Sequence, residues 1–375
     1  MLVDCDSPVG SFGLLHLLRP TMSSSITDVE INAEAESADI KAFHWEQKRK
    51  RMKAVQLSSF AGLDSLKLVE IDRPTPSENE VLIQVKAAGI NFAELEMIAG
   101  RYPAPRPLPL TVGFEASGIV AAVGSEVTSL KVGDRITSIV SSGGYAEYAT
   151  ADASMAIPIP HGVTFAEANA ITIQGLSAYT LLRFAARPQP DESVLIQSAA
   201  GGVGLFLVQL TKALGVKKVI ALASSKEKLD LVKSLGADFA INYKEEDWVA
   251  QVEQATGGRG VDIVLEANSG EIGDKSFKLM APFGRAVIYG AKNAHDSFPT
   301  EKIRQLILNN QSVTGFNFPS LQPERIRDSV PALLDLINKG QVKLFAKHAF
   351  GLADVRGAFE ALSNRQTIGK VVLTP

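Results

Sequence analysis

The sequence contains one cysteine, Cys5, so it has no pair of thiols for an internal disulfide and no cysteine-rich zinc site. No uninterrupted apolar run approaches the roughly 18 residues that a membrane-spanning helix requires. The formal net charge is −3 at pH 7, and the five histidines are scattered singly. A chain without a basic excess has no electrostatic footprint for nucleic acid or for an anionic membrane. We therefore predict a cytoplasmic protein with no nucleic-acid partner and no transmembrane segment.

The residues that are present predict two globular domains. The chain has 375 residues, of which 46% are hydrophobic and 21% are charged, and this is enough for more than one core. Residues 1–51 differ from the rest, because they are Ser-rich, then acidic, then basic at 48–51. Such a composition buries little apolar surface. We expect 1–51 to be a disordered N-terminal extension.

Short strands are predicted from Met52 to about residue 150. Val81, Ile83 and Val85 recur at every second position, as expected for a strand with one buried face. Further strand-like runs are separated by Gly, Pro and Asn and lie at 53–56, 66–71, 112–120, 132–136 and 143–149. Strands this short, broken by glycine turns at this density, predict a partly open β-barrel.

The pattern then changes to one of helices alternating with strands. Residues 164–186 have helical spacing and begin with a capping box, Thr164 and Glu167. The alternation that follows predicts a doubly wound parallel sheet of the Rossmann type, which we assign to 176–318. The expected helices are 226–235, 248–256 and 325–339, and the expected strands are 240–242, 261–266, 286–289, 312–316 and 369–373. We assign 52–175 and 319–375 to the β domain, to which the tail returns.

Residues 193–226 predict a dinucleotide site. An apolar strand, 194–196, is followed by a glycine-rich turn, a helix that ends at Gly215 and a second apolar strand, 219–222. This is the context that distinguishes a dinucleotide turn from a chance glycine cluster, although Ala199 replaces the first glycine of the motif. Glycines allow the backbone to approach a pyrophosphate closely. The exposed N–H groups at the start of the helix then attract its negative charge. The turn residues expected to bind it are Ala200, Gly201, Gly202, Val203 and Gly204.

The end of the second strand indicates which cofactor binds. Sites for NAD usually carry Asp or Glu there to bind the ribose 2′-OH, whereas this chain has Ala223. Ser224, Ser225 and Lys226 follow, and two hydroxyls and an ammonium group suit a 2′-phosphate. We therefore predict NADPH. In an alternative reading, one of the serines caps the next helix and Lys226 lies in solvent.

Several motifs resemble a known family. They are 87–94 (AAGINFAE), 113–115 (GFE), 132–135 (VGDR), 143–149, 199–204 and 369–373. In this order, over 52–375, they resemble the medium-chain dehydrogenase/reductase superfamily, specifically its zinc-free quinone oxidoreductase branch. Within that branch, 92–93, 199–204 and 315–316 are similar to the vesicle amine transport protein-1 group. The resemblance implies an α/β protein with a GroES-like, partly open β-barrel catalytic domain and a Rossmann domain for NADPH.

Departures from the zinc-dependent members of this superfamily indicate the chemistry. Asn91 stands where those enzymes place a cysteine, Phe114 where they place a histidine, and Gln174 at their third ligand position. Zinc requires thiolate, imidazole or carboxylate donors, so we predict no metal. Alcohol oxidation is difficult without a Lewis acid, whereas an electron-poor acceptor takes hydride more easily. The resemblance thus implies hydride transfer from NADPH to a quinone or an α,β-unsaturated carbonyl.

The resemblance also implies roles for single residues, each beside a structural alternative. Asn91 faces the cleft and hydrogen-bonds the nicotinamide ribose or the substrate oxygen, or it only forms a turn. Tyr102 shapes the acceptor site or supplies a proton, or it is an ordinary loop aromatic. Tyr243 lies beside the adenosine phosphate, or it packs in the core. Gly290, at a strand end, and Phe316 with Asn317 would lie at the nicotinamide.

Two other functions stay open at this point. The chain is alternatively an enoyl reductase of a polyketide or secondary-metabolite pathway, for which a wide, basic cleft mouth would be expected. It is alternatively an NADPH-binding trafficking or scaffold protein with little activity, recruited to vesicles through 1–51. Folds of this kind commonly form homodimers through the edge of the nucleotide-domain sheet, and we expect the same here.

Overall fold

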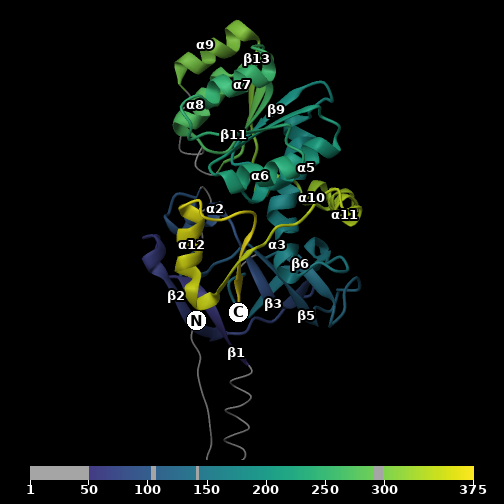
Figure 1. The fold of residues 1–375 in the computed structure, drawn as a ribbon. Coiled ribbons are helices and arrows are strands. Elements are labelled where there is room, and N and C mark those ends of the chain that lie inside the picture. Colours follow the sequence, from purple (N-terminus) through teal and green to yellow (C-terminus); the bar gives the residue numbers. More distant parts are fainter. Residues whose placement is uncertain (1–49, 103–106, 141–142, 291–298) are drawn as a thin grey trace, which may run out of the picture. The chain divides into compact units, whose positions relative to one another are not determined.

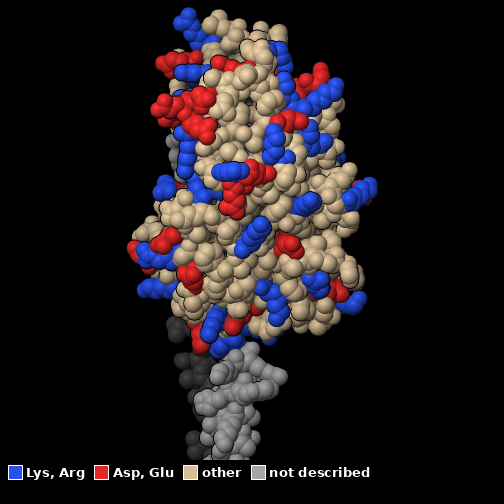
Figure 2. All heavy atoms as spheres, in the orientation of Figure 1, with Lys and Arg blue, Asp and Glu red and all other residues tan. Residues whose placement is uncertain are grey.

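The computed structural model describes residues 50–102, 107–140, 143–290 and 299–375. The extension expected at 1–51 lies outside the described residues except for its last two. Residues Arg51–Pro375 form one compact unit (Figure 1). No helix in the described ranges is long and apolar enough to cross a membrane. Basic and acidic side chains are interspersed over the face drawn in Figure 2.

A six-stranded sheet forms the cofactor domain. All its neighbouring strands are parallel, in the order β11-β10-β9-β12-β13-β14. Counted from β9 along the chain, this is 3-2-1-4-5-6, the doubly wound Rossmann order that the alternating pattern predicted. The strands are β9 (Ser193–Ile196), β10 (Lys218–Ala223), β11 (Phe239–Asn242), β12 (Val261–Glu266), β13 (Met280–Ile288) and β14 (Ser312–Gly315).

Helices cover both faces of this sheet. Val194 and Ile196 of β9 pack into one core and Leu195 into another, so neither face of the strand meets water. The helices are α5 (Gly202–Ala213), α6 (Lys226–Ser234), α7 (Trp248–Thr256), α8 (Gly270–Lys278) and α9 (Thr300–Asn309). The expected helices at 226–235 and 248–256 are confirmed by α6 and α7, whereas α8 and α9 were not expected.

The other domain consists of antiparallel and mixed sheets. The larger has the order β15-β16-β3-β5-β6-β8, with β7 on β3, and the smaller has the order β2-β1-β4. This arrangement, beside the Rossmann sheet, confirms the GroES-like partly open β architecture. The strands are β1 (Arg51–Leu57), β2 (Leu66–Asp72), β3 (Glu80–Ile90), β4 (Leu110–Thr111), β5 (Glu115–Val123), β6 (Arg135–Ile139), β7 (Tyr148–Asp152), β8 (Ile157–Pro158), β15 (His348–Gly351) and β16 (Val371–Thr374).

The tail contacts both domains. Ile326 of α10 (Pro323–Arg327) and Leu333 of α11 (Val330–Asn338) pack into the same core as Val194. Further on, α12 (Val355–Ser363) leads to β16, which pairs antiparallel with β3. The end of the tail, in yellow, lies among the purple and blue strands of the first domain in Figure 1.

A nearly continuous helical stretch joins the two domains. It begins with the predicted capping box, in which Glu167 N–H donates to Thr164 Oγ1 over 3.2 Å and Thr164 N–H donates to Glu167 over 3.0 Å. The stretch consists of α3 (Phe165–Asn169), the π-helical segment η3 (Ala170–Gly175), α4 (Leu176–Thr180) and a second π-helical segment, η4 (Leu181–Ala186). The expected boundary at 175/176 falls inside it. Wide turns of this kind are frequent at functional sites, and η3 contributes to the cavity described below.

Candidate active site

A cavity of about 870 Å³, here called the main cavity, lies at the carboxyl ends of the Rossmann strands and is closed on its other side by the β domain. Ligands of doubly wound sheets bind at this edge, where the strand order reverses between β9 and β12. Most of the residues selected from the sequence line it: Asn91, Tyr102, Ala200, Gly201, Gly202, Val203, Gly204, Ser224, Tyr243, Gly290, Phe316 and Asn317.

The glycine-rich turn fits a diphosphate. Gly201 is the N-cap of α5, a helix of 12 residues whose first N–H groups face the cavity and attract an anion. A Cβ atom on Gly204 would lie 2.2 Å from Ser198 O, and one on Gly202 would lie 2.0 Å from Gln174 Nε2. Gly204 has no room for a side chain because the clash is with backbone atoms, whereas at Gly202 the clash is with the end of the Gln174 side chain. The backbone therefore stays bare at the point where the cofactor approaches.

Two buried amide atoms in the main cavity lack a partner within the protein. Gln174 Oε1 and Asn268 Nδ2 are both buried without a hydrogen bond, and both residues line the cavity. Asn268 is held in place because its Oδ1 accepts from Ser198 Oγ over 2.6 Å. An unpartnered buried polar atom costs about 1–3 kcal/mol, so a ligand that supplies an acceptor and a donor here gains affinity. Sequence reasoning missed Ser198 and Asn268, which come together only across the sheet.

The structure does not place Ser225 and Lys226 at the main cavity. Ser225 is the N-cap of α6, and its Oγ accepts from Lys228 N–H over 3.5 Å. Lys226 Nζ lies 2.6 Å from Asp230, and its side chain is 85% exposed. Only Ser224 of the expected phosphate-binding trio lines the cavity. Ser225 and Lys226 thus follow the alternative of a helix cap and a solvated lysine.

Two other basic residues, Lys228 and Arg365, line the main cavity where Lys226 does not. Both line the main cavity with Tyr243. Lys228 Nζ donates to Arg365 O over 2.6 Å, and Arg365 donates to the Tyr243 hydroxyl over 2.7 Å. Burial, with the charges of Lys244 and Arg365, lowers the pKa of Lys228. Cations that destabilise one another in this way gain most from a bound anion, so this end of the cavity suits the 2′-phosphate of NADPH.

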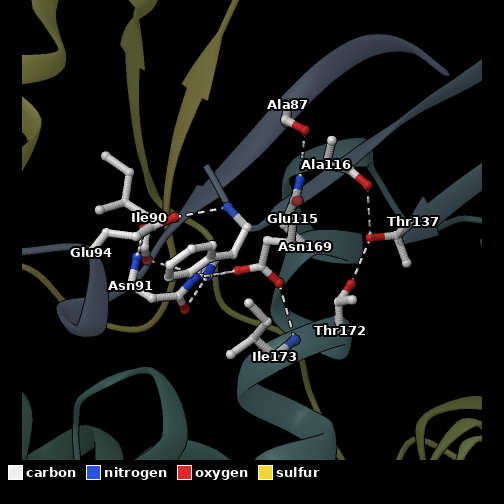
Figure 3. A network of polar contacts seen from close by, with 12 residues as sticks. Ala87, Ile90, Asn91, Glu94, Glu115, Ala116, Thr137, Asn169, Thr172 and Ile173 are labelled. Atoms are coloured by element: carbon white, nitrogen blue, oxygen red, sulfur yellow. Dashed lines mark hydrogen bonds and ion pairs between the residues drawn. The ribbon is translucent and has the colours of Figure 1, made fainter. Parts of the chain in front are cut away.

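A buried polar network holds Asn91 in the opposite wall. Its Nδ2 donates to Glu115 Oε1 and its Oδ1 accepts from Lys370 Nζ, each over 2.8 Å. Lys370 also forms an ion pair with Glu115, and both side chains are fully buried. Figure 3 shows the Asn91 and Glu115 side chains turned toward each other, with Glu115 reaching the backbone of Ile173 in η3. The network uses one N–H of the Asn91 amide and leaves the second for a ligand.

Glu94 extends this network away from the main cavity. Its carboxyl accepts hydrogen bonds from the Tyr145 hydroxyl over 2.6 Å and from the N–H groups of Asn91 and Phe114 over 2.7 and 2.9 Å. Burial nevertheless raises the pKa of Glu94 to about 7, because these hydrogen bonds and Lys370 only partly offset the loss of hydration. The pKa of Glu94 therefore lies near neutral pH, and its carboxyl accepts a hydrogen bond from the backbone of Asn91.

The positions of the zinc ligands in zinc-dependent members come together here. Asn91, Phe114 and Gln174 all line the main cavity, although they come from three separate elements. Tyr102 lines it as well, with its ring centroid 6.1 Å from that of Phe114 and the planes tilted by 40°. Asn91 and the apolar residue Ile173 line the same cavity.

Family models match both halves of the chain. Residues 77–161 match the alcohol dehydrogenase GroES-like domain, and residues 202–339 match the family described as zinc-binding dehydrogenase. A quinone oxidoreductase of Pseudomonas aeruginosa is 33% identical over 329 residues, which cover 86% of this chain and 99% of that one. The synaptic vesicle membrane protein VAT-1 homolog of Homo sapiens is 31% identical over 343 residues, 86% of each chain.

Solved structures agree with these relatives. The Escherichia coli quinone oxidoreductase complexed with NADPH has a TM-score of 0.79 at 32% identity and covers 86% of this chain and 100% of that one. The CurK enoyl reductase has a TM-score of 0.78 at 28% identity, with 87% and 99% coverage. The chain belongs to the medium-chain dehydrogenase/reductase superfamily, in its quinone oxidoreductase branch. It is an oxidoreductase that depends on NADPH.

Proposed function

We propose that the protein reduces a quinone or an α,β-unsaturated carbonyl with NADPH and without zinc. The observation that carries this proposal is the set Asn91, Phe114 and Gln174 in the main cavity. An amide, a phenyl ring and a second amide do not form a zinc site, which needs thiolate, imidazole or carboxylate donors. Among the described residues, no three His, Cys, Asp or Glu side chains are grouped so that they would hold a metal ion.

The chain's own groups suit transfer to an acceptor that is already electron-poor. NADPH, when bound, supplies the hydride. The protein then positions the acceptor and excludes water, for which Ile139, Val140 and Ile173 provide an apolar wall. Hydride adds to the electron-poor carbon or quinone oxygen, and a proton from Tyr102 or from water reaches the resulting enolate or phenolate. Asn91 offers its second N–H to the ribose or to the substrate oxygen.

An enoyl reductase acting on carrier-bound or CoA-linked substrates is the second candidate, and the charge of the cavity argues against it. The charged residues that line the acceptor end are Asp152, Glu324 and Arg327, and Arg327 is 2.9 Å from Glu324. Carboxylates there disfavour the phosphates of such a carrier. The other basic residues of the main cavity, Lys228 and Arg365, lie at the end suited to the cofactor.

Stopped-flow oxidation of NADPH against a panel of quinones and enones tests the proposal. We expect turnover with several acceptors, the same rate after treatment with a strong zinc chelator, and no oxidation of simple alcohols by NADP⁺. The proposal is overturned if tightly bound NADPH is oxidised by none of the acceptors. A rate that falls with chelation and returns with added Zn²⁺ overturns zinc independence alone.

We also propose a homodimer formed through the sheet edge at β14. This strand ends the order of described strands, and apolar side chains beside it are exposed: Phe283 is 76% exposed, Ile307 72% and Leu308 68%. An unpaired edge with apolar neighbours suits pairing with a second copy. A trafficking role would depend on 1–51, of which 1–49 lie outside the described residues. The cytoplasmic location expected from the sequence stays a prediction.

A further inference from the structure

A second, smaller cavity adjoins the acceptor end of the main cavity. It has a volume of about 170 Å³ and is here called the side pocket. Ile139, Met155 and Ile326 line both cavities, so the two cavities adjoin at these residues. It then extends between β8 and the start of α11, where Ile157 and Val330 line it.

The inner walls of the side pocket are apolar, whereas Ser154 and Arg327 line the end that it shares with the main cavity, where Arg327 pairs with Glu324 over 2.9 Å. Ile157, Leu176 and Ile326 are 3%, 1% and 6% exposed, and all three line it. Its buried hydroxyl, on Thr172, is already paired with Thr137 over 2.8 Å. The buried side-chain atoms without partners in the described ranges belong to Asn169, Gln174, Thr211 and Asn268, and none of these lines the side pocket. Away from Ser154 and Arg327, water would find few partners, so an apolar group is the better occupant of the inner part of the pocket.

Adjacent positions of one helical stretch separate the two cavities. Thr172 and Leu176 line the side pocket, whereas Ile173, Gln174 and Ser177 line the main cavity. A ligand branch in the side pocket would therefore lie directly behind residues that line the main cavity. A molecule that occupied both cavities would pass Ile139 and Met155, which line both.

We infer that the side pocket binds an unbranched alkyl or a small aryl substituent of the acceptor, about six carbons in size. An apolar cavity of roughly 150 Å³ stays dry and accepts a benzene ring, which sets this size. A longer chain would leave the pocket near Pro331, which is exposed. The inference rests on the proposed function and extends it, because it names the shape and polarity that distinguish a good acceptor from a poor one.

A series of alk-3-en-2-ones tests the inference, because the methyl ketone stays constant while the alkyl chain on the double bond grows from one to nine carbons. We expect kcat/KM to rise about three- to fourfold for each added methylene, the effect of burying one methylene, and to level off near six carbons. A rate constant that does not change with chain length, in an enzyme that reduces the shortest member, overturns the inference and leaves the proposed function intact.

Two variants at Val330 connect the effect to the side pocket. Val330→Phe fills it, and we expect the six-carbon acceptor to lose at least tenfold in kcat/KM while the one-carbon acceptor is unchanged. Val330→Ala enlarges it and moves the plateau to a longer chain, and this smaller side chain is compatible with folding. Val132→Phe is the matched control, because Val132 is 62% exposed and lines neither cavity. The same loss in Val132→Phe contradicts the assignment.

Binding of unreactive ketones separates the two proposals. Saturated alkan-2-ones of the same lengths are titrated by calorimetry, with and without NADPH, into the wild type and Val330→Phe. Affinity that rises with chain length only in the wild type supports the side pocket. If no acceptor is reduced in the same experiments, the proposed function is overturned and the side pocket is not. Affinity that is independent of chain length overturns the side pocket whatever the turnover.

Discussion

Two lysines in the first turn of α6 have opposite surroundings, although only one residue separates them. Lys226 pairs with Asp230 in solvent, whereas Lys228 lines the main cavity beside Arg365 and Tyr243. Successive helical residues are rotated by about 100°, so side chains two positions apart point in nearly opposite directions. The local sequence shows a lysine after two serines, but only the docking of the helix decides which lysine faces the ligand.

Lys228→Ala therefore weakens NADPH binding selectively. A charge-assisted hydrogen bond contributes about 1.5–3 kcal/mol, so we expect the Kd for NADPH to rise roughly 10- to 150-fold while that for NADH changes little. Fluorescence titration with both cofactors at one ionic strength measures this. Lys226→Ala is the matched control and retains wild-type affinity. Equal losses for both cofactors, or an equal effect of Lys226→Ala, would contradict the assignment.

Glu94 makes stability depend on pH. Its pKa is raised to about 7 in the folded protein, above the usual value of 4.5, so the folded state binds the proton more tightly than the unfolded chain does. The free energy of unfolding therefore falls as pH rises from about 4.5 to about 7, by up to about 3 kcal/mol for this group. Glu94→Gln removes this dependence, although it also loses hydrogen bonds at every pH.

Urea denaturation at pH 5 and pH 8 measures the effect of Glu94. We expect the wild type to be more stable than Glu94→Gln at pH 5 by a larger margin than at pH 8. Taking the difference between the two proteins cancels the other titrating groups. A margin that is constant between the two pH values, or that grows with pH, would show that Glu94 stays ionised in the folded state.

Elements with strong local signals were predictable from the sequence. The predicted helix 248–256 and strand 261–266 coincide with α7 and β12. The predicted helix 325–339 is wrong as one element, because Pro331 is in the first turn of a new helix and the chain breaks between α10 and α11. Helix α8 was missed because the Ser269-Gly270 pair at its start is typical of a turn. In the structure Ser269 has a φ of 56° and is the N-cap of this helix.

The candidate site also contains residues that the sequence predicts and residues that it does not. The glycine-rich turn was predictable because one continuous segment carries strand, turn and helix, and its residues do line the main cavity. Lys370 was not predictable, because its partner Glu115 lies 255 residues away in the chain. Arg365 lies 137 residues from Lys228, and no local pattern relates them. Residues that act through pairing between distant strands leave no spacing to detect.

At the scale of the whole molecule, the exposed apolar residues near β14 predict a dimer. The chain has a mass of 40.1 kDa, so light scattering coupled to size exclusion should give about twice that value for the wild type. Ile307→Glu places a charge in the proposed interface, and we expect it to shift the protein toward the monomer. Val132→Glu, at an exposed position in the β domain, is the control and stays dimeric. A monomeric wild type at micromolar concentration contradicts the proposal.

The pairing of β16 with β3 has a consequence for folding. Lys370, just before β16, donates to Ile90 O of β3 across a separation of 280 residues, and Gly369 donates to Ala200 O at the glycine-rich turn. The β domain begins before the Rossmann domain in the chain. Its larger sheet is complete only after β16 has been synthesised, and β16 follows the whole Rossmann domain. During synthesis the cofactor domain is therefore able to fold first, and the wall that anchors Asn91 is completed last.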